Sequence, residues 1–423
     1  MELYNPSELR GWPGIRVDRL VLARALTGDI VALRRLLKAV DSVTRSIVDQ
    51  TLYVSIVSAT LRENVGLRAF ERRELAEWTA TAAYESGDFQ TASSILESIE
   101  EPDLANLAML ASCLGEDNRH HAAIRLADEI EFRAGPTDDD ARLVAGLIRI
   151  ANFFAIGERA RAAELHSHLL HAEAEKRSNL FGFVMRFSEI VVDFPHCTAD
   201  LLSGAELLDA AGFHKSAAYS KLSGAVHLAY SGDVDSARAL LGAARKRLTN
   251  EIRDRAILAN NAVAIELLSQ SPDLTSCIDE LNSVICTVRD DFSRVVLHIN
   301  RLICLRLIGD VGRARRDIDL VERILSSPKF GNTDIFWNAY FNIWAFFRAI
   351  GDVVAEKRVA SRFGSLIPDC PAYQSYWDAR LGQNIDPPPE FSFLMRFDFH
   401  PEYISHWQLD AEGFRLLRTE FVR

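Results

Sequence analysis

The stretch that decides the fold runs from Leu222 to Leu241 and reads LSGAVHLAYSGDVDSARALL. It predicts a helix, a tight turn at Gly232-Asp233, and a second helix that folds back on the first. Gly232 can adopt the left-handed backbone conformation that ends a helix, and Asp233 can accept hydrogen bonds from the free N–H groups that begin the next one. Small residues on both helices would allow close approach. The stretch therefore predicts one antiparallel helical hairpin.

The same pattern recurs along the chain. A single hairpin cannot bury its apolar face without neighbours, so hairpins repeated at a fixed period are typical of a solenoid. No run in this region alternates apolar and polar residues as a strand would. The sequence therefore predicts an all-α solenoid of antiparallel helical hairpins. After a break at Gly135-Pro136-Thr137, turns are expected about 37 to 42 residues apart, near Gly157, Phe194-Pro195, Gly232, Pro272, Gly309 and Gly351.

Breaks in the pattern predict three parts. Residues 1–135 are expected to form irregular N-terminal hairpins, residues 136–384 the regular solenoid, and residues 385–423 a separate C-terminal part. At the first boundary, Asp138 or Asp139 can cap the helix that follows.

The C-terminal part begins with Ile385-Asp386-Pro387-Pro388-Pro389-Glu390, a stiff, non-helical linker. The next nine residues read as an extended segment with its large apolar side chains on one side, and residues 408–422 as a last amphipathic helix. The aromatic side of this segment either caps the last hairpins or docks on the sheet edge of a partner. The docking residues would be Phe391, Phe393, Phe397 and Phe399.

The turns resemble those of the tetratricopeptide family, which has Gly at the turn and Ala five positions later. The resemblance covers residues 80–367, although most units lack the early Trp and the closing Pro of the family, and the period exceeds the usual 34 or so. It implies a right-handed superhelix whose first helices line a concave surface that binds proteins or peptides. The long units resemble those of bacterial peptide-sensing regulators and of the sensor arms of bacterial signalling ATPases. The matching pairs are Gly87/Ala92, Gly157/Ala162, Gly232/Ala237 and Gly309/Ala314.

Composition limits the classes of function. Apolar residues make up 48% of the chain and charged residues 25%, an ordinary soluble balance. The net charge of -11 argues against general affinity for nucleic acid, which needs a basic surface. Six scattered cysteines without a CxxC pair suit a reducing compartment, and the arginine-rich usage of basic residues suggests a bacterial genome. With neither a secretory signal nor a membrane-spanning run evident, we expect a cytoplasmic protein of unspecified oligomeric state.

Three expected first helices carry asparagine at matching positions. Asn260, Asn300 and Asn342 are 40 and 42 residues apart, Asn338 lies one turn before the last of them, and Lys221 extends the column backwards. On a concave surface, Asn can hydrogen-bond the backbone of an extended peptide through both its C=O and NH2 groups, and Lys can bind a carboxylate. We therefore predict these five residues as ligand-binding. The alternative is that mid-helix asparagines are solvated or bridge two helices.

The expected helix from Asp334 to Ile350 carries aromatic residues on every side. This distribution predicts burial on more than one face, by packing between the last repeats and the C-terminal segment. The alternative is an aromatic-lined ligand pocket beside Asn338 and Asn342.

The sequence favours a non-catalytic protein without metal or cofactor. Glu164, His168, His171 and Glu175 share one helix face, but zinc sites draw ligands from more than one element, and no second contributor can be named. Neither GxSxG nor HExxH occurs, and no Cys/His signature is recognisable. The first hypothesis is a protein- or peptide-binding adaptor. The second is a ligand- or peptide-sensing regulatory subunit that acts on a separate effector, and the third is a metal-dependent enzyme.

Overall fold

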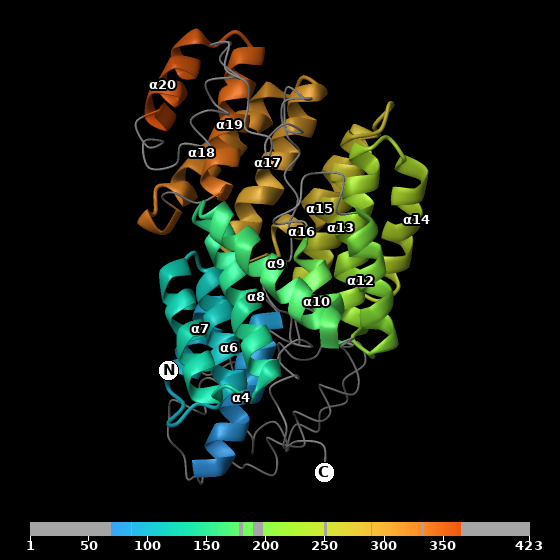
Figure 1. Cartoon of the computed structure of the whole chain (residues 1–423). Coiled ribbons are helices and arrows are strands. Elements are labelled where there is room, and N and C mark those ends of the chain that lie inside the picture. The colour runs from blue at the N-terminus through green and yellow to red at the C-terminus, as the bar shows by residue number, and fades with distance from the viewer. Residues whose placement is uncertain are drawn as a thin grey trace, which may run out of the picture.

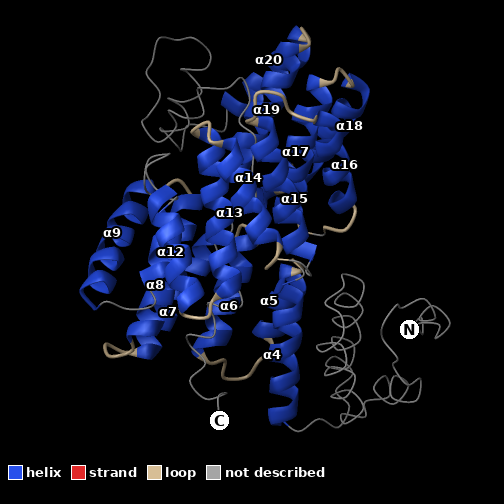
Figure 2. Ribbon diagram, turned by 90° about the vertical axis from the view of Figure 1, so that its right-hand side faces the viewer, coloured by secondary structure: helices blue, strands red, loops and turns tan. Residues whose placement is uncertain are grey.

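The computed structural model describes residues 69–85, 87–176, 181–188, 198–248, 252–288, 290–330 and 334–364. Within these ranges all regular structure is helical and no strand occurs, which confirms the all-α class for this part of the chain (Figure 2). None of the described helices is both long and apolar enough to cross a membrane. The predicted C-terminal linker and aromatic segment, including Phe391, Phe393, Phe397 and Phe399, lie outside the described residues.

The helices follow one another with short connections (Figure 1). In chain order they are α4 (Ala69–Glu85), α5 (Phe89–Glu97), α6 (Leu104–Glu116), α7 (His120–Ala134), α8 (Asp139–Ala155), α9 (Arg159–Lys176), α10 (Phe181–Arg186), α12 (Thr198–Ala210), α13 (His214–Tyr230), α14 (Val234–Arg245), α15 (Ile252–Leu267), α16 (Leu274–Ile285), α17 (Asp291–Leu307), α18 (Val311–Leu325), the short 3-10 helix η2 (Pro328–Phe330), α19 (Asp334–Ala349) and α20 (Val353–Gly364).

Consecutive helices pack against each other as hairpins, and the first helix of one hairpin also packs against the first helix of the next. This second relation holds for α6 with α8 and for α13, α15, α17 and α19 in series. The arrangement is that of a helical repeat, in which each hairpin completes the apolar core of its neighbours.

The glycine turns form as the sequence predicts, whereas the expected turn at Phe194-Pro195 lies outside the described residues. Gly87, Gly157, Gly232, Gly309 and Gly351 all have positive φ, between 71° and 92°. The aspartates that follow four of them cap the next helix. Asp233, for example, accepts a hydrogen bond from the Ser236 backbone N–H at 3.1 Å. Asp138, one of the two expected caps at the 135/136 boundary, accepts from the Ala141 N–H at 3.0 Å.

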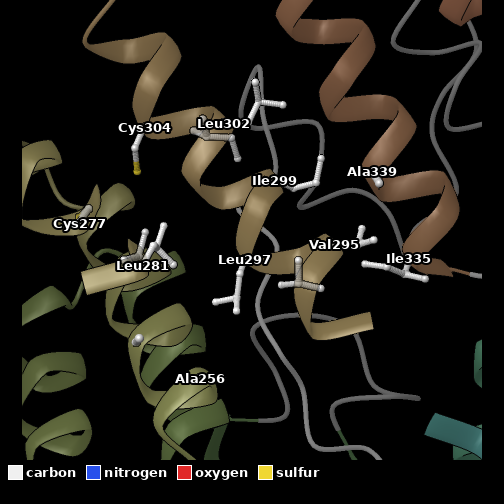
Figure 3. Packing of buried hydrophobic residues seen from close by; sticks show 14 of the residues in the cluster. Ala256, Cys277, Leu281, Val295, Leu297, Ile299, Leu302, Cys304, Ile335 and Ala339 are labelled. Atoms are coloured by element: carbon white, nitrogen blue, oxygen red, sulfur yellow. The ribbon is translucent and has the colours of Figure 1, made fainter. Parts of the chain in front are cut away.

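The buried apolar residues form two clusters, one from Ala76 to Ala217 and one from Ala218 to Val359. Ile130 and Ala141 belong to the same cluster, so the core continues across the 135/136 boundary. In the second cluster, side chains of α15, α16, α17 and α19 face one another (Figure 3). Helix α19 is buried on several faces, as its aromatic residues predict: Phe336, Tyr340, Phe341, Trp344, Phe346 and Phe347 are each at most 3% exposed.

Candidate functional site

The predicted asparagine column lies in the core. Asn260 and Asn300 are fully buried, and Asn300 Nδ2 donates to Asn260 Oδ1 at 3.0 Å, which joins α17 to α15. Asn342 is 1% exposed, and its Nδ2 donates to the carbonyl oxygen of Asn338 at 2.9 Å. The alternative of asparagines that bridge helices thus describes Asn260 and Asn300. Peptide binding by them stays a prediction that would require the first helices to separate.

The other two predicted binding residues keep part of their exposure. Asn338 is half-buried on α19. Lys221 Nζ lies 2.6 Å from Asp209 Oδ2, so an ion pair between α12 and α13 already compensates its charge. Asp209 also accepts from His214 Nδ1 at 2.9 Å. Lys221 could therefore bind an incoming carboxylate only in competition with Asp209.

A different group of residues joins helices that are far apart in sequence. Arg253, in the first turn of α15, forms an ion pair with Glu116, the last residue of α6, 137 positions earlier. The two side chains are only 6% and 10% exposed. Because hairpins of a solenoid ordinarily contact only their neighbours, this pair shows that the N-terminal hairpins meet the second half of the described chain.

Aromatic rings and a tight turn complete this contact. The guanidinium carbon of Arg253 lies 4.9 Å from the centre of the Phe89 ring and 5.6 Å from that of Tyr84, within the range of cation–π attraction. A Cβ on Gly87 would lie 3.2 Å from Oδ2 of Asp290, the residue that caps α17. The α4–α5 turn and the end of α6 thus meet the beginnings of α15 and α17. We call Tyr84, Phe89, Glu116, Arg253 and Asp290 the closure cluster.

Burial and charge act against each other in the closure cluster. Burial raises the pKa of Glu116, and the adjacent Arg253 guanidinium offsets part of that rise. Burial also raises the pKa of Asp290, opposed by hydrogen bonds from Ser293 and by the charge of Arg253. For Arg253 itself, burial lowers the pKa, but the charge and hydrogen bond of Glu116, with further contributions from Tyr84 and Tyr219, together outweigh it, so its pKa is raised and it stays protonated. One guanidinium therefore compensates two carboxylates in a nearly dry site.

A second polar group adjoins the closure cluster through the next residue. Asp254, 3% exposed, accepts a hydrogen bond from the Tyr219 hydroxyl and lies 3.5 Å from Lys215 Nζ. The guanidinium of Arg186 lies 5.3 Å from the centre of the Tyr219 ring. These contacts join α13 to the start of α15, and α10 to α13. The residue next to Arg253 is therefore anchored to the neighbouring helices.

Another buried acid–base contact lies between α17 and α18. His298 Nδ1 is 2.9 Å from Asp317 Oδ1, and Arg301 donates to both carboxylate oxygens, at 2.9 and 2.6 Å. Burial would raise the pKa of Asp317, but these hydrogen bonds lower it below its ordinary value. Arg301 also donates to Asn282 Oδ1 at 2.7 Å. The group thereby fastens three consecutive helices to one another.

The described residues contain no group of three or more His, Cys, Asp or Glu side chains placed to hold a metal ion. On α9, His168 and His171 are exposed, whereas the neighbouring His166 is buried with Nε2 3.0 Å from the carbonyl oxygen of Val184. The histidines of that helix therefore face different surroundings and do not converge on one point.

Sequence reasoning missed the closure cluster, because no periodicity relates Glu116 to Arg253. One local signal was available: an arginine in the first turn of a helix is disfavoured by the helix dipole unless a carboxylate compensates it. In comparisons with known proteins, no protein-family model matches the chain, and no curated protein shows significant similarity to it.

Proposed function

We propose that the chain is a right-handed, tetratricopeptide-like solenoid that serves as a non-catalytic scaffold for binding a protein or peptide in the bacterial cytoplasm. The observation that carries this proposal is the uninterrupted series α13, α15, α17 and α19, in which each first helix packs on the next and on its own second helix. Such stacking creates an extended surface, which repeat proteins use for recognition. The resemblance at the Gly-to-Ala turns supports the same function.

Burial of the asparagines changes which residues can make the first contact. Of the five predicted binding residues, Asn338 and Lys221 are the two that keep solvent exposure. We assign initial contact with the partner to them. Asn260, Asn300 and Asn342 would contribute only if the partner separates neighbouring first helices.

The test is native purification of the tagged full chain from its host, with the captured polypeptides measured by mass spectrometry. We expect a polypeptide in stoichiometric amount. The Lys221→Ala/Asn338→Ala variant should lose it, while Arg238→Ala, an exposed change on the second helix α14, should retain it. A wild-type chain that purifies without a stoichiometric polypeptide would contradict the proposal.

The closure cluster favours one elaboration, a regulatory subunit that changes shape when it binds its ligand. A buried ion pair between distant hairpins gives two alternative arrangements, closed with the charges paired and open with both solvated. Hydrogen exchange of α5 and of the start of α15, measured with and without the captured polypeptide, tests this. We expect both segments to exchange faster in the complex. Unchanged exchange would contradict the regulatory subunit and support a scaffold that keeps its shape on binding.

A further inference from the structure

Among the described residues, large apolar side chains are exposed at two separate places. A single exposed apolar side chain is common on protein surfaces, whereas a group of them rimmed by charged residues marks an interaction site. Here four such side chains form a group, and the fifth is almost completely exposed. The side chains and their exposed fractions are Phe132 at 88%, Leu307 and Ile308 at 47% each, Val353 at 54% and Val354 at 82%.

The first place is the pair of hairpin tips α17–α18 and α19–α20. Leu307 and Ile308 lie at one tip, Val353 and Val354 at the other. The Arg315 guanidinium, early in α18, lies 2.7 Å from the carboxylate of Asp352, in the next tip, so the two tips are neighbours. We call the tip segments 306–316 and 348–358 the basic tip, since they carry seven basic and three acidic residues.

Part of this positive charge is uncompensated. Arg315 pairs with Asp352 and Arg358 with Glu322, but Arg316, Arg348 and Lys357 have no carboxylate within 4.0 Å among the described residues. All three lie close to a tip in the sequence, within the same two segments as the exposed aliphatic side chains. The basic tip therefore suits a partner that is apolar and negatively charged.

The second place is the end of α7. Phe132 projects there almost fully into solvent. Residues 125–142 around it carry six acidic and three basic residues, the inverse of the balance at the basic tip. Arg149 contacts both Asp128 and Glu131, at 2.8 and 2.6 Å, and Arg142 lies 3.9 Å from Glu131, so these carboxylates are partly compensated. The segment itself still carries three more acidic than basic residues. We call residues 125–142 the acidic knob.

We propose that the acidic knob of one copy docks on the basic tip of a second copy, with Phe132 inserted among Leu307, Ile308, Val353 and Val354. The two surfaces are complementary in charge and both are apolar at their centres, as protein interfaces are. Helices α7 and α20 lie toward opposite ends of the molecule in both views (Figures 1 and 2). The contact is therefore heterologous. When two copies associate, one keeps a free acidic knob and the other a free basic tip, so further copies can add head to tail and form an open chain or a ring.

This inference goes beyond the proposed function and does not rest on it. It is tested on the purified full-length chain alone, by sedimentation velocity over a range of concentrations at low and high salt. Wild type should form species larger than a monomer as concentration rises, and less so at high salt because the charges are screened. Phe132→Asp and Val354→Asp should each weaken association at least tenfold. Ala243→Asp, a change at an exposed position of α14, should leave association unchanged.

Mixing the two variants separates this geometry from a symmetric one. Phe132→Asp retains its basic tip and Val354→Asp its acidic knob, so an equal mixture should form dimers and nothing larger. A Phe132→Asp chain that still dimerises alone would overturn the proposal in favour of tip-to-tip contact. A wild-type chain that stays monomeric at every concentration would overturn it too, and would leave both surfaces to other proteins. Neither result affects partner capture, which is measured in the host.

Discussion

Arg253 and Glu116, 137 residues apart, form a buried ion pair between the first turn of α15 and the last residue of α6. The pair adds a long-range contact to those between neighbouring hairpins, because it joins the N-terminal hairpins to the second half of the described residues. Removing both charges from water is costly, so the pair stabilises one arrangement only while both partners are present.

The α4–α5 turn should be the least tolerant of the glycine turns. Gly87 and Gly232 both have positive φ, 78° and 92°, so alanine at either position should cost about 1–2 kcal/mol. A Cβ at Gly87 would also lie 3.2 Å from the Asp290 carboxylate, which its hydrogen bond to the Ser293 N–H at 2.7 Å holds in place. A Cβ at Gly232 would have no such neighbouring atom within 4 Å. Urea unfolding should show a larger loss for Gly87→Ala, and equal losses would mean that the turn does not contact α17.

Two buried histidines should make the fold sensitive to mild acid. Burial lowers the pKa of His120 to about 4 and that of His227 to about 3. In the unfolded chain both titrate near 6.5, so the unfolded state binds more protons below that pH. This contribution to stability is therefore complete above pH of about 6.5, and as the pH drops through the folded pKa values it falls by about 3 kcal/mol for His120 and about 5 kcal/mol for His227.

The measurement is the urea midpoint of wild type and of the His120→Gln/His227→Gln variant between pH 7 and 4. The variant, which has no proton to gain at these positions, should show a flatter dependence on pH. Parallel curves for the two proteins would show that other groups cause the acid sensitivity.

The asparagine pair should behave as a structural unit. Because Asn300 donates to Asn260 in the core, Asn300→Ala or Asn260→Ala alone should lower the free energy of unfolding by about 1–3 kcal/mol. The double variant should lose less than the two single losses added together, since both remove the same hydrogen bond. Asn338→Ala, at a half-buried position, serves as the control and should change little. Unaltered unfolding in the two core variants would place these asparagines on an open surface instead.

Local sequence signals anticipated the hairpins well. Gly232-Asp233 contains both the residue that ends one helix and the residue that caps the next, and the structure shows the expected positive φ and the hydrogen bond from the Ser236 backbone N–H to Asp233. The aromatic residues of α19 likewise predicted burial on several faces, and the structure confirms it. In these cases the determining interactions lie within a few residues or within one helix, where spacing is informative.

The candidate site was harder to anticipate. Spacing aligned Asn260 with Asn300 correctly, but it could not tell that the first helices are enclosed on nearly all sides, so the shared position is internal. The contact between Arg253 and Glu116 depends on how many hairpins lie between α6 and α15 and on the angles at which they pack. Those quantities are sums of many small packing rotations, and no short motif reports them.

The most direct test of the closed arrangement is a double-mutant cycle on this pair. Unfolding free energies would be measured for wild type, Glu116→Gln, Arg253→Met and the double variant. Each single change should cost about 3–5 kcal/mol, because it leaves an uncompensated buried charge, and the double variant should recover most of that loss. Losses that simply add would contradict the account, because they would mean that α6 and α15 do not meet.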